Sequence, residues 1–217
     1  NGSTDATGTS ASFNFPKGIT TDGTNLYVAD YSNHRIRKIV ISTGVVTTLA
    51  GSTSNYSGST DASGNSARFK NPSAVTIVGG NLYVAEYGNH KIRKIVLSNG
   101  AVTTLAGSGS QGSTDATGTS ATFSFPQAIT TDGTNLYVAD TNNNKIRKID
   151  TSTGFVTTLA GSGTAGFTNA TGTAAKFNYP SGSATDGTNL YVTDRDNHII
   201  RKIVISSGVV TTLAGSA

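Results

Sequence analysis

One pattern occurs four times along this chain of 217 residues. The string Thr-Thr-Leu-Ala-Gly begins at Thr47, Thr103, Thr157 and Thr211, and Leu-Tyr-Val begins at Leu26, Leu82, Leu136 and Leu190. Both series have spacings of 56, 54 and 54 residues. A fixed period of this length indicates one supersecondary unit per repeat, which buries its apolar surface against neighbouring copies. We therefore expect one domain of four units, with approximate boundaries at 1–51, 52–107, 108–161 and 162–217.

The composition favours β-structure over helices. Glycine occurs 26 times, and each glycine inside a helix costs about 1 kcal/mol relative to alanine. Valine, isoleucine, leucine, tyrosine and phenylalanine recur at fixed phases of the repeat, which is not the composition of a disordered chain. No apolar run approaches the roughly 20 residues that cross a membrane as a helix. Eleven of the 16 basic residues lie in the third predicted strand of the repeats, so the net charge of +4 is a property of the repeat.

The first repeat predicts four short strands, at residues 18–21, 25–30, 35–41 and 45–50. Asp22-Gly23 marks the first turn, residues 31–34 form the second, and Gly44 closes the third. Apolar residues lie on both faces of the strands, as at Leu26 and Tyr27, so both faces of each sheet are expected to be covered. We predict an all-β fold, a β-propeller of four-stranded antiparallel blades with four blades in this chain.

Long polar loops join the repeats, at 51–72, 107–126 and 161–180. Each loop has a phenylalanine at one phase, which is predicted to fill the apolar seam between sheets, and a proline that stiffens the entry to the next strand. These residues are Phe13, Phe69, Phe123, Phe177, Pro16, Pro72, Pro126 and Pro180. One aspartate per loop (Asp5, Asp61, Asp115) is too few for a calcium site and is expected to close a local Asx-type turn.

The turn after the second strand carries a recognisable motif. It reads Asn33-His34-Arg35-Ile36, and its equivalents begin at Asn89, Asn143 and Asn197, with Ile-Arg-Lys-Ile in every copy. Together with Leu-Tyr-Val-Ala-Asp upstream, this resembles the NHL repeat family over essentially the whole chain. The resemblance implies a β-propeller, usually of six blades, serving as a binding platform, an RNA-binding module or the scaffold of a peptide-amidating lyase. This chain departs from the pattern in having four repeats, in Asn144 at the histidine position and in Ile199.

Several recurring polar residues are interpreted as structural. The acids that end the second strands (Asp30, Glu86, Asp140, Asp194) face arginines across the hairpins (Arg37, Arg93, Arg147, Arg201), so each acid is expected to accept backbone or arginine hydrogen bonds. The histidines His34, His90 and His198 occupy one phase of the repeat and are expected to bond local backbone; as equivalent positions on different blades they should not converge on a metal. No catalytic group, metal site or cofactor is predicted.

The long loops and the turns after the second strands share one face of a propeller, and the turn residues vary most between repeats. We predict that any protein or glycan partner binds there. The candidate residues of this partner-binding face are Tyr31, His34, Arg35, Tyr87, His90, Lys91, Asn142, Lys145, Arg195 and His198. Nucleic acid is not expected, because Thr141 replaces the aromatic residue in the third copy and Asp196 adds a negative charge in the fourth.

The sequence favours a non-enzymatic binding or scaffold module. Its alternatives are a lyase- or lactonase-like propeller enzyme and an RNA-binding NHL module. An open arc of blades leaves two apolar faces in water, so we expect ring closure, either within one chain, by self-association of two chains or within a longer propeller; self-association is favoured. A cysteine-free sequence rich in Thr, Ser, Gly and Asn is typical of an extracellular or surface-displayed bacterial protein.

Overall fold

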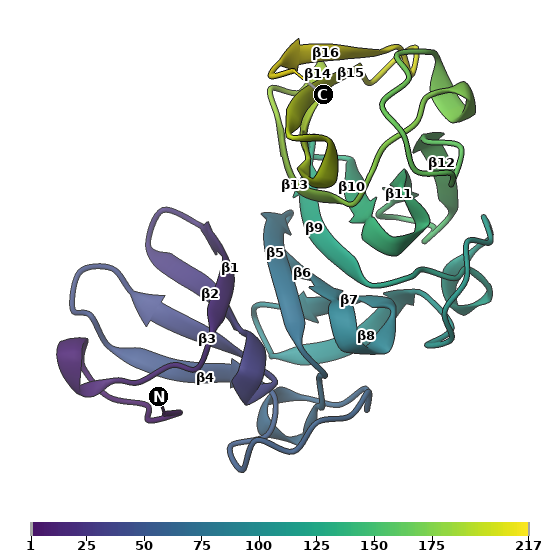
Figure 1. Ribbon diagram of the computed structural model, residues 1–217. Helices are drawn as coiled ribbons and strands as arrows, with labels where there is room; N and C mark the ends of the chain where they lie inside the picture. The colour runs from purple at the N-terminus through teal and green to yellow at the C-terminus, as the bar shows by residue number, and fades with distance from the viewer. Residues whose placement is uncertain (1, 217) are drawn as a thin grey trace. The chain divides into compact units, whose positions relative to one another are not determined.

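The computed structural model describes residues 2–216, which form four four-stranded antiparallel sheets with the strands in chain order (Figure 1). We call these sheets blades. Blade 1 contains β1 (Pro16–Thr21), β2 (Asn25–Asp30), β3 (Arg35–Val40) and β4 (Val46–Ala50). Blade 2 contains β5 (Pro72–Val78), β6 (Asn81–Glu86), β7 (Lys91–Val96) and β8 (Ala101–Ala106). Blade 3 contains β9 (Pro126–Thr131), β10 (Asn135–Asp140), β11 (Lys145–Asp150) and β12 (Val156–Ala160). Blade 4 contains β13 (Pro180–Thr185), β14 (Asn189–Asp194), β15 (Ile199–Val204) and β16 (Val210–Ala214).

The predicted all-β propeller of four-stranded blades is confirmed. In blade 1 the second strand has the predicted bounds, whereas the first begins two residues earlier, at Pro16, because Pro16 pairs with Asp30 across an irregularity in the ladder. The chain divides into two compact units between Thr104 and Leu105, within β8. Blades 1 and 2 make up the first unit, and blades 3 and 4 the second.

Each blade has two apolar faces because successive side chains of a strand point to opposite sides. The A face carries the tyrosine of the second strand, and the B face carries the leucine that precedes it. In the first unit, Tyr27 and Ile36 on the A face of blade 1 form one buried cluster with Leu82 and Ile95 on the B face of blade 2.

The second unit repeats this packing. Tyr137 and Ile146 of blade 3 form a buried cluster with Leu190 and Ile203 of blade 4. Phe177 lies in this cluster and is fully buried, as its counterpart Phe69 is in the first unit. The predicted filling of the seam by a loop phenylalanine is thus confirmed in both units.

The innermost strands of blades 1 and 2 approach each other closely at Gly18. A Cβ on Gly18 would lie 2.5 Å from the Cα of Ala74 and 3.0 Å from the carbonyl oxygen of Ser73. The backbone contact leaves no room for a side chain, which explains glycine at this position.

The long loop that precedes each blade braces the outer strand of that same blade. Thr7 bridges Val45 at the start of the fourth strand of blade 1, and Thr171 bridges Val209 in blade 4. The Val46 N–H also donates to the Ala6 carbonyl, at 2.8 Å. Each blade is therefore a four-stranded sheet with its own polar brace.

A buried arginine joins the brace to the sheet, and we call it and its partners the arginine hub. Arg147 Nη1 donates to Asp140 at 2.7 Å and to the Thr122 carbonyl at 3.0 Å, while Nη2 donates to Asp115 at 2.6 Å. The guanidinium carbon lies 5.1 Å from the centroid of the Phe123 ring. Both Arg147 and Asp140 are fully buried, and a buried charge is tolerated when it is paired and hydrogen-bonded in this way.

The hub recurs in every blade. Arg37 pairs with Asp30 at 3.0 Å, Arg93 with Glu86 at 2.9 Å and Arg201 with Asp194 at 2.9 Å. The predicted structural role of these acids is confirmed. Each acid also accepts a backbone N–H from the preceding loop; those donors are Asn14, Lys70, Ser124 and Asn178.

The loop aspartates do not close the local turns that the sequence predicted. Asp115 accepts the Thr158 N–H, 43 residues away, at 2.9 Å, as well as the arginine of the hub. Asn169 takes this place in blade 4 and accepts from Arg201 at 2.9 Å without a charge. The prediction was wrong because the partner is the fourth strand of the same blade, which is remote in the sequence.

The two carboxylates of one hub should differ sharply in their contribution to stability. Asp140→Asn removes the fully buried one of the two carboxylates that pair with the buried Arg147 guanidinium, so we expect a loss of about 3–5 kcal/mol. Asp115→Asn reproduces the natural arrangement at Asn169, and the side chain of Asp115 is 42% exposed, so the expected loss is about 1 kcal/mol or less. Urea unfolding followed by far-UV circular dichroism measures both; equal losses would contradict this account of the hub.

Candidate ligand-binding face

The turn after the second strand has one conformation in all four blades. A short 3-10 turn, at Tyr31–Asn33, Tyr87–Asn89, Thr141–Asn143 and Arg195–Asn197, is followed by a residue in the left-handed region. These residues have φ values between 50° and 59° and are His34, His90, Asn144 and His198. Histidine and asparagine tolerate this backbone better than most side chains. The left-handed turn therefore accounts for the residue types seen at this position.

The turn is fixed to the hub by its asparagine. Asn143 Nδ2 donates to Asp140 at 2.8 Å and to the Gly112 carbonyl at 2.7 Å. The same pair of bonds holds Asn33 and Asn197 in their blades. The final glycine of Thr-Thr-Leu-Ala-Gly packs against this turn, since a Cβ on Gly51 would lie 2.7 Å from the Cβ of Arg35. The first two residues of each turn are thus presented from a rigid support.

The left-handed residue connects neighbouring blades within a unit, and we call this contact the blade latch. His34 Nδ1 accepts the Asn71 N–H at 3.1 Å, and Asn144 Oδ1 accepts the Tyr179 N–H at 2.9 Å. The two acceptor atoms are the same number of bonds from the backbone, so histidine and asparagine serve equally. The partners lie 37 and 35 residues further along, so for His34 this contact is additional to the local bond with the Tyr31 backbone that the sequence predicts.

The latch donors have an unusual backbone themselves. Asn71 and Tyr179 each precede a proline and have φ values of 51° and 54°. A residue before proline normally adopts an extended conformation with negative φ. Phe15 and Phe125 also have a positive φ before a proline, so this strained backbone conformation is a regular feature of the repeat.

The blade latch makes His34 sensitive to protonation. Nδ1 accepts a hydrogen bond only in the neutral ring, so the proton of that ring lies on Nε2. Burial lowers the pKa of His34 below its usual value; the hydrogen bond with the Tyr31 backbone opposes this shift, and the Lys70 ammonium adds to it. His90 is also buried, at 8% exposed, and burial followed by Lys70 lowers its pKa as well. His198 is exposed.

Arg35 does not belong to an exposed face, contrary to its place in the predicted set. It is 1% exposed, and its guanidinium donates to the Ser3 carbonyl and to Asn55 Oδ1 of the flanking loops. At the same position, Lys91 and Lys145 are half-buried and donate to loop serines. The side chains at this position thus bond the blade's own long loop, and Arg35 is buried by these contacts.

Tyr31 and Tyr87 come together in the first unit, as neighbours on adjacent blades. Their ring centroids are 6.1 Å apart and the rings are tilted by 56°. The Lys17 ammonium lies 3.6 Å from the centroid of Tyr31 and 5.7 Å from that of Tyr87. We call these three residues the tyrosine cluster. Burial raises the pKa of Tyr31 and lowers that of Lys17.

Sequence reasoning missed Lys17. Its position holds Ser73, Gln127 and Ser181 in the other repeats, so variation between repeats marked it in the same way as the turn residues. Lys17 is exposed, whereas both tyrosines are half-buried. Within residues 2–216, no carboxylate forms an ion pair with Lys17.

The second unit presents different side chains at the equivalent turn positions. Thr141 is fully buried and its hydroxyl donates to the Pro180 carbonyl at 2.7 Å, while Asn142 is exposed. Arg195 is exposed; it pairs with Asp196 at 2.7 Å and lies 5.0 Å from the centroid of the Tyr179 ring. The predicted face residues are therefore not equivalent: an aromatic cluster lies in the first unit, and an exposed ion pair beside a tyrosine lies in the second.

Potential metal ligands do not gather in the part of the chain that the structure describes. No three His, Cys, Asp or Glu side chains among residues 2–216 lie together as a potential metal site. In the same range, no helix has the length and apolar character needed to cross a bilayer.

The blade latch predicts a pH dependence of stability that a single substitution should remove. Because the pKa of His34 is lower in the folded protein than in the unfolded chain, the unfolded chain binds more protons between the two values. The contribution is complete above about pH 6.5 and is lost as pH falls towards the folded value. His34→Asn keeps the acceptor and should reduce the drop in melting temperature between pH 7.5 and pH 5. Asn144→His should increase it, and an unchanged drop in both variants would contradict the latch.

Comparisons with known proteins agree with this architecture. The family model for the NHL repeat matches residues 13–39. Over 193 residues the chain is 32% identical to NHL repeat-containing protein 2 of Homo sapiens, covering 82% of this chain and 26% of that protein. The chain thus spans about a quarter of the length of this relative.

Two solved structures are similar in fold. An auxiliary nutrient binding protein from Bacteroides ovatus superposes with a TM-score of 0.67 at 21% identity, covering 94% of this chain and 50% of that one. Virginiamycin B lyase from Staphylococcus aureus superposes with a TM-score of 0.58 at 18% identity, covering 91% and 54%. With the repeat motif, the four blades and the similarity to NHL repeat-containing protein 2, the chain belongs to the NHL-repeat family of β-propellers.

Proposed function

We propose that this protein is a non-enzymatic binding module that recognises glycans on its loop face, with acidic sugars preferred over neutral ones. The observation that carries the proposal is the tyrosine cluster. Two tyrosines on a rigid support each offer an apolar ring with a polar tip, which suits a sugar ring with its hydroxyl groups. The accessible Lys17 ammonium has no carboxylate partner in the described chain, so it favours a ligand with a carboxylate or sulfate group.

The carboxylates that end the second strands are committed to the fold. Each buried carboxylate of residues 2–216 that ends a second strand is bound to an arginine and to a backbone N–H. General acid–base catalysis needs a carboxyl or imidazole that can reach substrate. This supports a binding role over a lyase-like one, and the similarity to virginiamycin B lyase is a similarity of fold.

Nucleic acid is a weaker candidate for the partner. Arg35, one of the cations assigned to the face, is buried, and Arg195 is paired with Asp196. A nutrient-binding function is given for the Bacteroides ovatus protein of similar fold, and an extracellular or surface location, which the composition favours, would place this chain where glycans are met.

Isothermal titration calorimetry with oligogalacturonate and with an uncharged oligosaccharide of equal length tests the proposal. We expect the acidic oligosaccharide to bind, and the Tyr31→Ala/Tyr87→Ala variant to bind it at least tenfold more weakly. Lys17→Met should reduce the preference for the acidic sugar. Tyr56→Ala is the matched control, because Tyr56 is 68% exposed on a loop outside the cluster.

Three outcomes would overturn the proposal. One is the absence of binding to any glycan of a broad array, and another is glycan binding that the Tyr31→Ala/Tyr87→Ala variant retains in full. The third is binding of single-stranded RNA with a steep salt dependence, which would assign the cations and tyrosines to phosphates and bases instead.

A further inference from the structure

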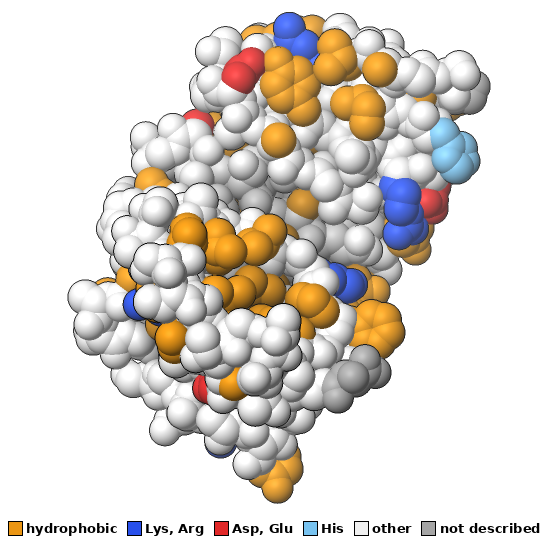
Figure 2. All heavy atoms as spheres, turned by 90° about the vertical axis from the view of Figure 1, so that its left-hand side faces the viewer, with side chains coloured by type: hydrophobic (Ala, Val, Ile, Leu, Met, Phe, Trp, Pro, Cys, Tyr) orange, Lys and Arg blue, Asp and Glu red, His pale blue; other side chains and the backbone are white. Residues whose placement is uncertain are grey.

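The B face of blade 1 is partly exposed in the part of the chain that the structure describes. Ile19 is 58% exposed, whereas Val75 at the same position of blade 2 is 5% exposed. An open groove of about 220 Å³ runs over this face and is lined by Phe13, Pro16, Ile19, Val28 and Ile39. Figure 2 views the side on which blade 1 lies in Figure 1, and hydrophobic side chains gather there in a hollow.

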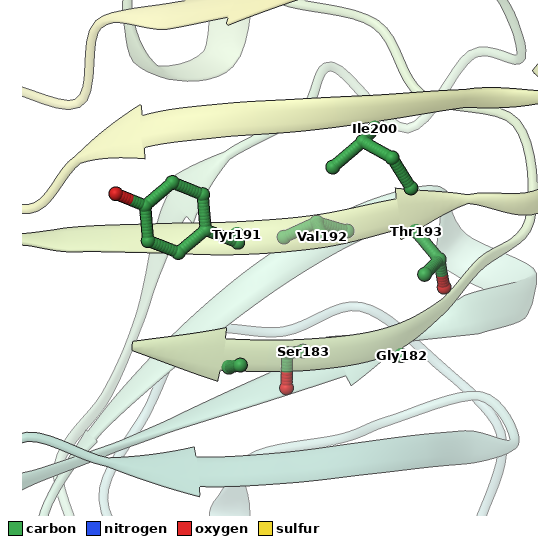
Figure 3. Close-up of a pocket in the computed structure, with 7 residues that line it drawn as sticks. Gly182, Ser183, Tyr191, Val192, Thr193 and Ile200 are labelled. Atoms are coloured by element: carbon green, nitrogen blue, oxygen red, sulfur yellow. The ribbon is translucent and has the colours of Figure 1, made fainter. Parts of the chain in front are cut away.

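The A face of blade 4 is partly exposed as well. Ala214 is exposed and Ile200 is half-buried, whereas their counterparts in blade 3, Ala160 and Ile146, are fully buried. Leu213 is 54% exposed. A shallow groove of about 280 Å³ lies on this blade, and Figure 3 shows the Tyr191 and Ile200 side chains projecting from β14 and β15 at the groove.

Neither of these two faces is polar, as the outer face of a capping repeat would be. A repeat that ends an array in water needs a polar outer face. Blade 1 keeps Ile19 and Val28 on its B face, and blade 4 keeps Tyr191, Ile200 and Leu213 on its A face. These are the same residue types that pack A face to B face inside each unit.

The two halves of a blade latch are present at the same two ends. His198 of blade 4 has the left-handed φ of 59° that His34 and Asn144 have, and Phe15 of blade 1 has the donor's φ of 50° before its proline. Within residues 2–216, neither the His198 imidazole nor the Phe15 N–H has a hydrogen-bond partner. The end blades therefore carry complementary halves of one junction, both in its apolar seam and in its latch.

We propose that the A face of blade 4 in one copy of this chain packs on the B face of blade 1 in a second copy. The junction repeats the packing seen within each unit, with His198 of one copy accepting the Phe15 N–H of the other. A second copy is the occupant because the chain itself supplies both complementary surfaces. The contact is head-to-tail, so each copy uses two different surfaces; such a contact forms a ring if the rotation between copies closes and an open filament if it does not.

Light scattering of the 217-residue protein, coupled to size-exclusion chromatography, tests the proposal. We expect the mass of a dimer or a larger assembly. Ile19→Lys and Leu213→Lys each place a charge on one exposed face, and each should reduce the protein to a monomer while the circular dichroism spectrum stays unchanged. Tyr56→Ala, remote from both faces, should leave the mass as in the wild type.

Mixing the two lysine variants distinguishes a head-to-tail contact from other assemblies. Ile19→Lys retains an intact A face on blade 4, and Leu213→Lys retains an intact B face on blade 1, so the mixture should form a dimer through one good junction. In the Leu213→Lys background, adding His198→Ala should leave this dimer unaffected. Adding His198→Ala to the Ile19→Lys partner should weaken it roughly fivefold to tenfold, as for one lost hydrogen bond.

A wild-type protein that is monomeric at 100 µM would overturn the proposal, since its faces would then be covered within one chain or left in water. A mixture of the two lysine variants that stays monomeric would also overturn it. So would a dimer that only one of the two variants disrupts, because that result indicates a symmetric contact of one face with itself.

Discussion

The buried arginine of each hub is the interaction on which the rest of the structure depends. A guanidinium without solvent needs partners for its charge and its N–H groups, and those partners come from two separate segments: the second strand, and the long loop with its phenylalanine. Arg147 thereby fixes the position of Asp140, Asp115 and Phe123 together. A polar, glycine-rich loop that lacks a core of its own is ordered because it satisfies this one cation.

The hub also explains how the turn residues after the second strands can vary while the strands of each blade stay the same. The asparagine of the turn bonds to the hub acid, and the residue after it holds the neighbouring blade. The two residues at the start of the turn take part in neither the hub nor the blade latch, and no two blades carry the same pair. Tyr31 and Tyr87 therefore form a cluster, while Thr141 is buried at the same position, without any change in the strands.

The sequence was sufficient for the blades, the strands and the pairing of acid and arginine, because these depend on short-range periodicity and on cross-strand neighbours. It was not sufficient where a partner comes from a remote segment. The loop aspartate Asp5 reaches Thr48, 43 residues on, and His34 reaches the next blade. Arg35 is buried by contacts with its own loops, although Lys91 at the same position is only half-buried. Lys17 joins the tyrosines through the packing of blades 1 and 2, which no single repeat reveals.

The long loop lies directly before the sheet that it binds, and this order affects how the number of blades can change during evolution. Because the loop binds the sheet that follows it, the segment from Gly51 to Gly107 contains one sheet together with all the partners of its arginine. A duplication or deletion of the corresponding stretch of coding sequence separates no hub residue from its partners. Recombination between the near-identical repeats can therefore add or remove a whole blade in one event, and the product folds by the same contacts as its parent.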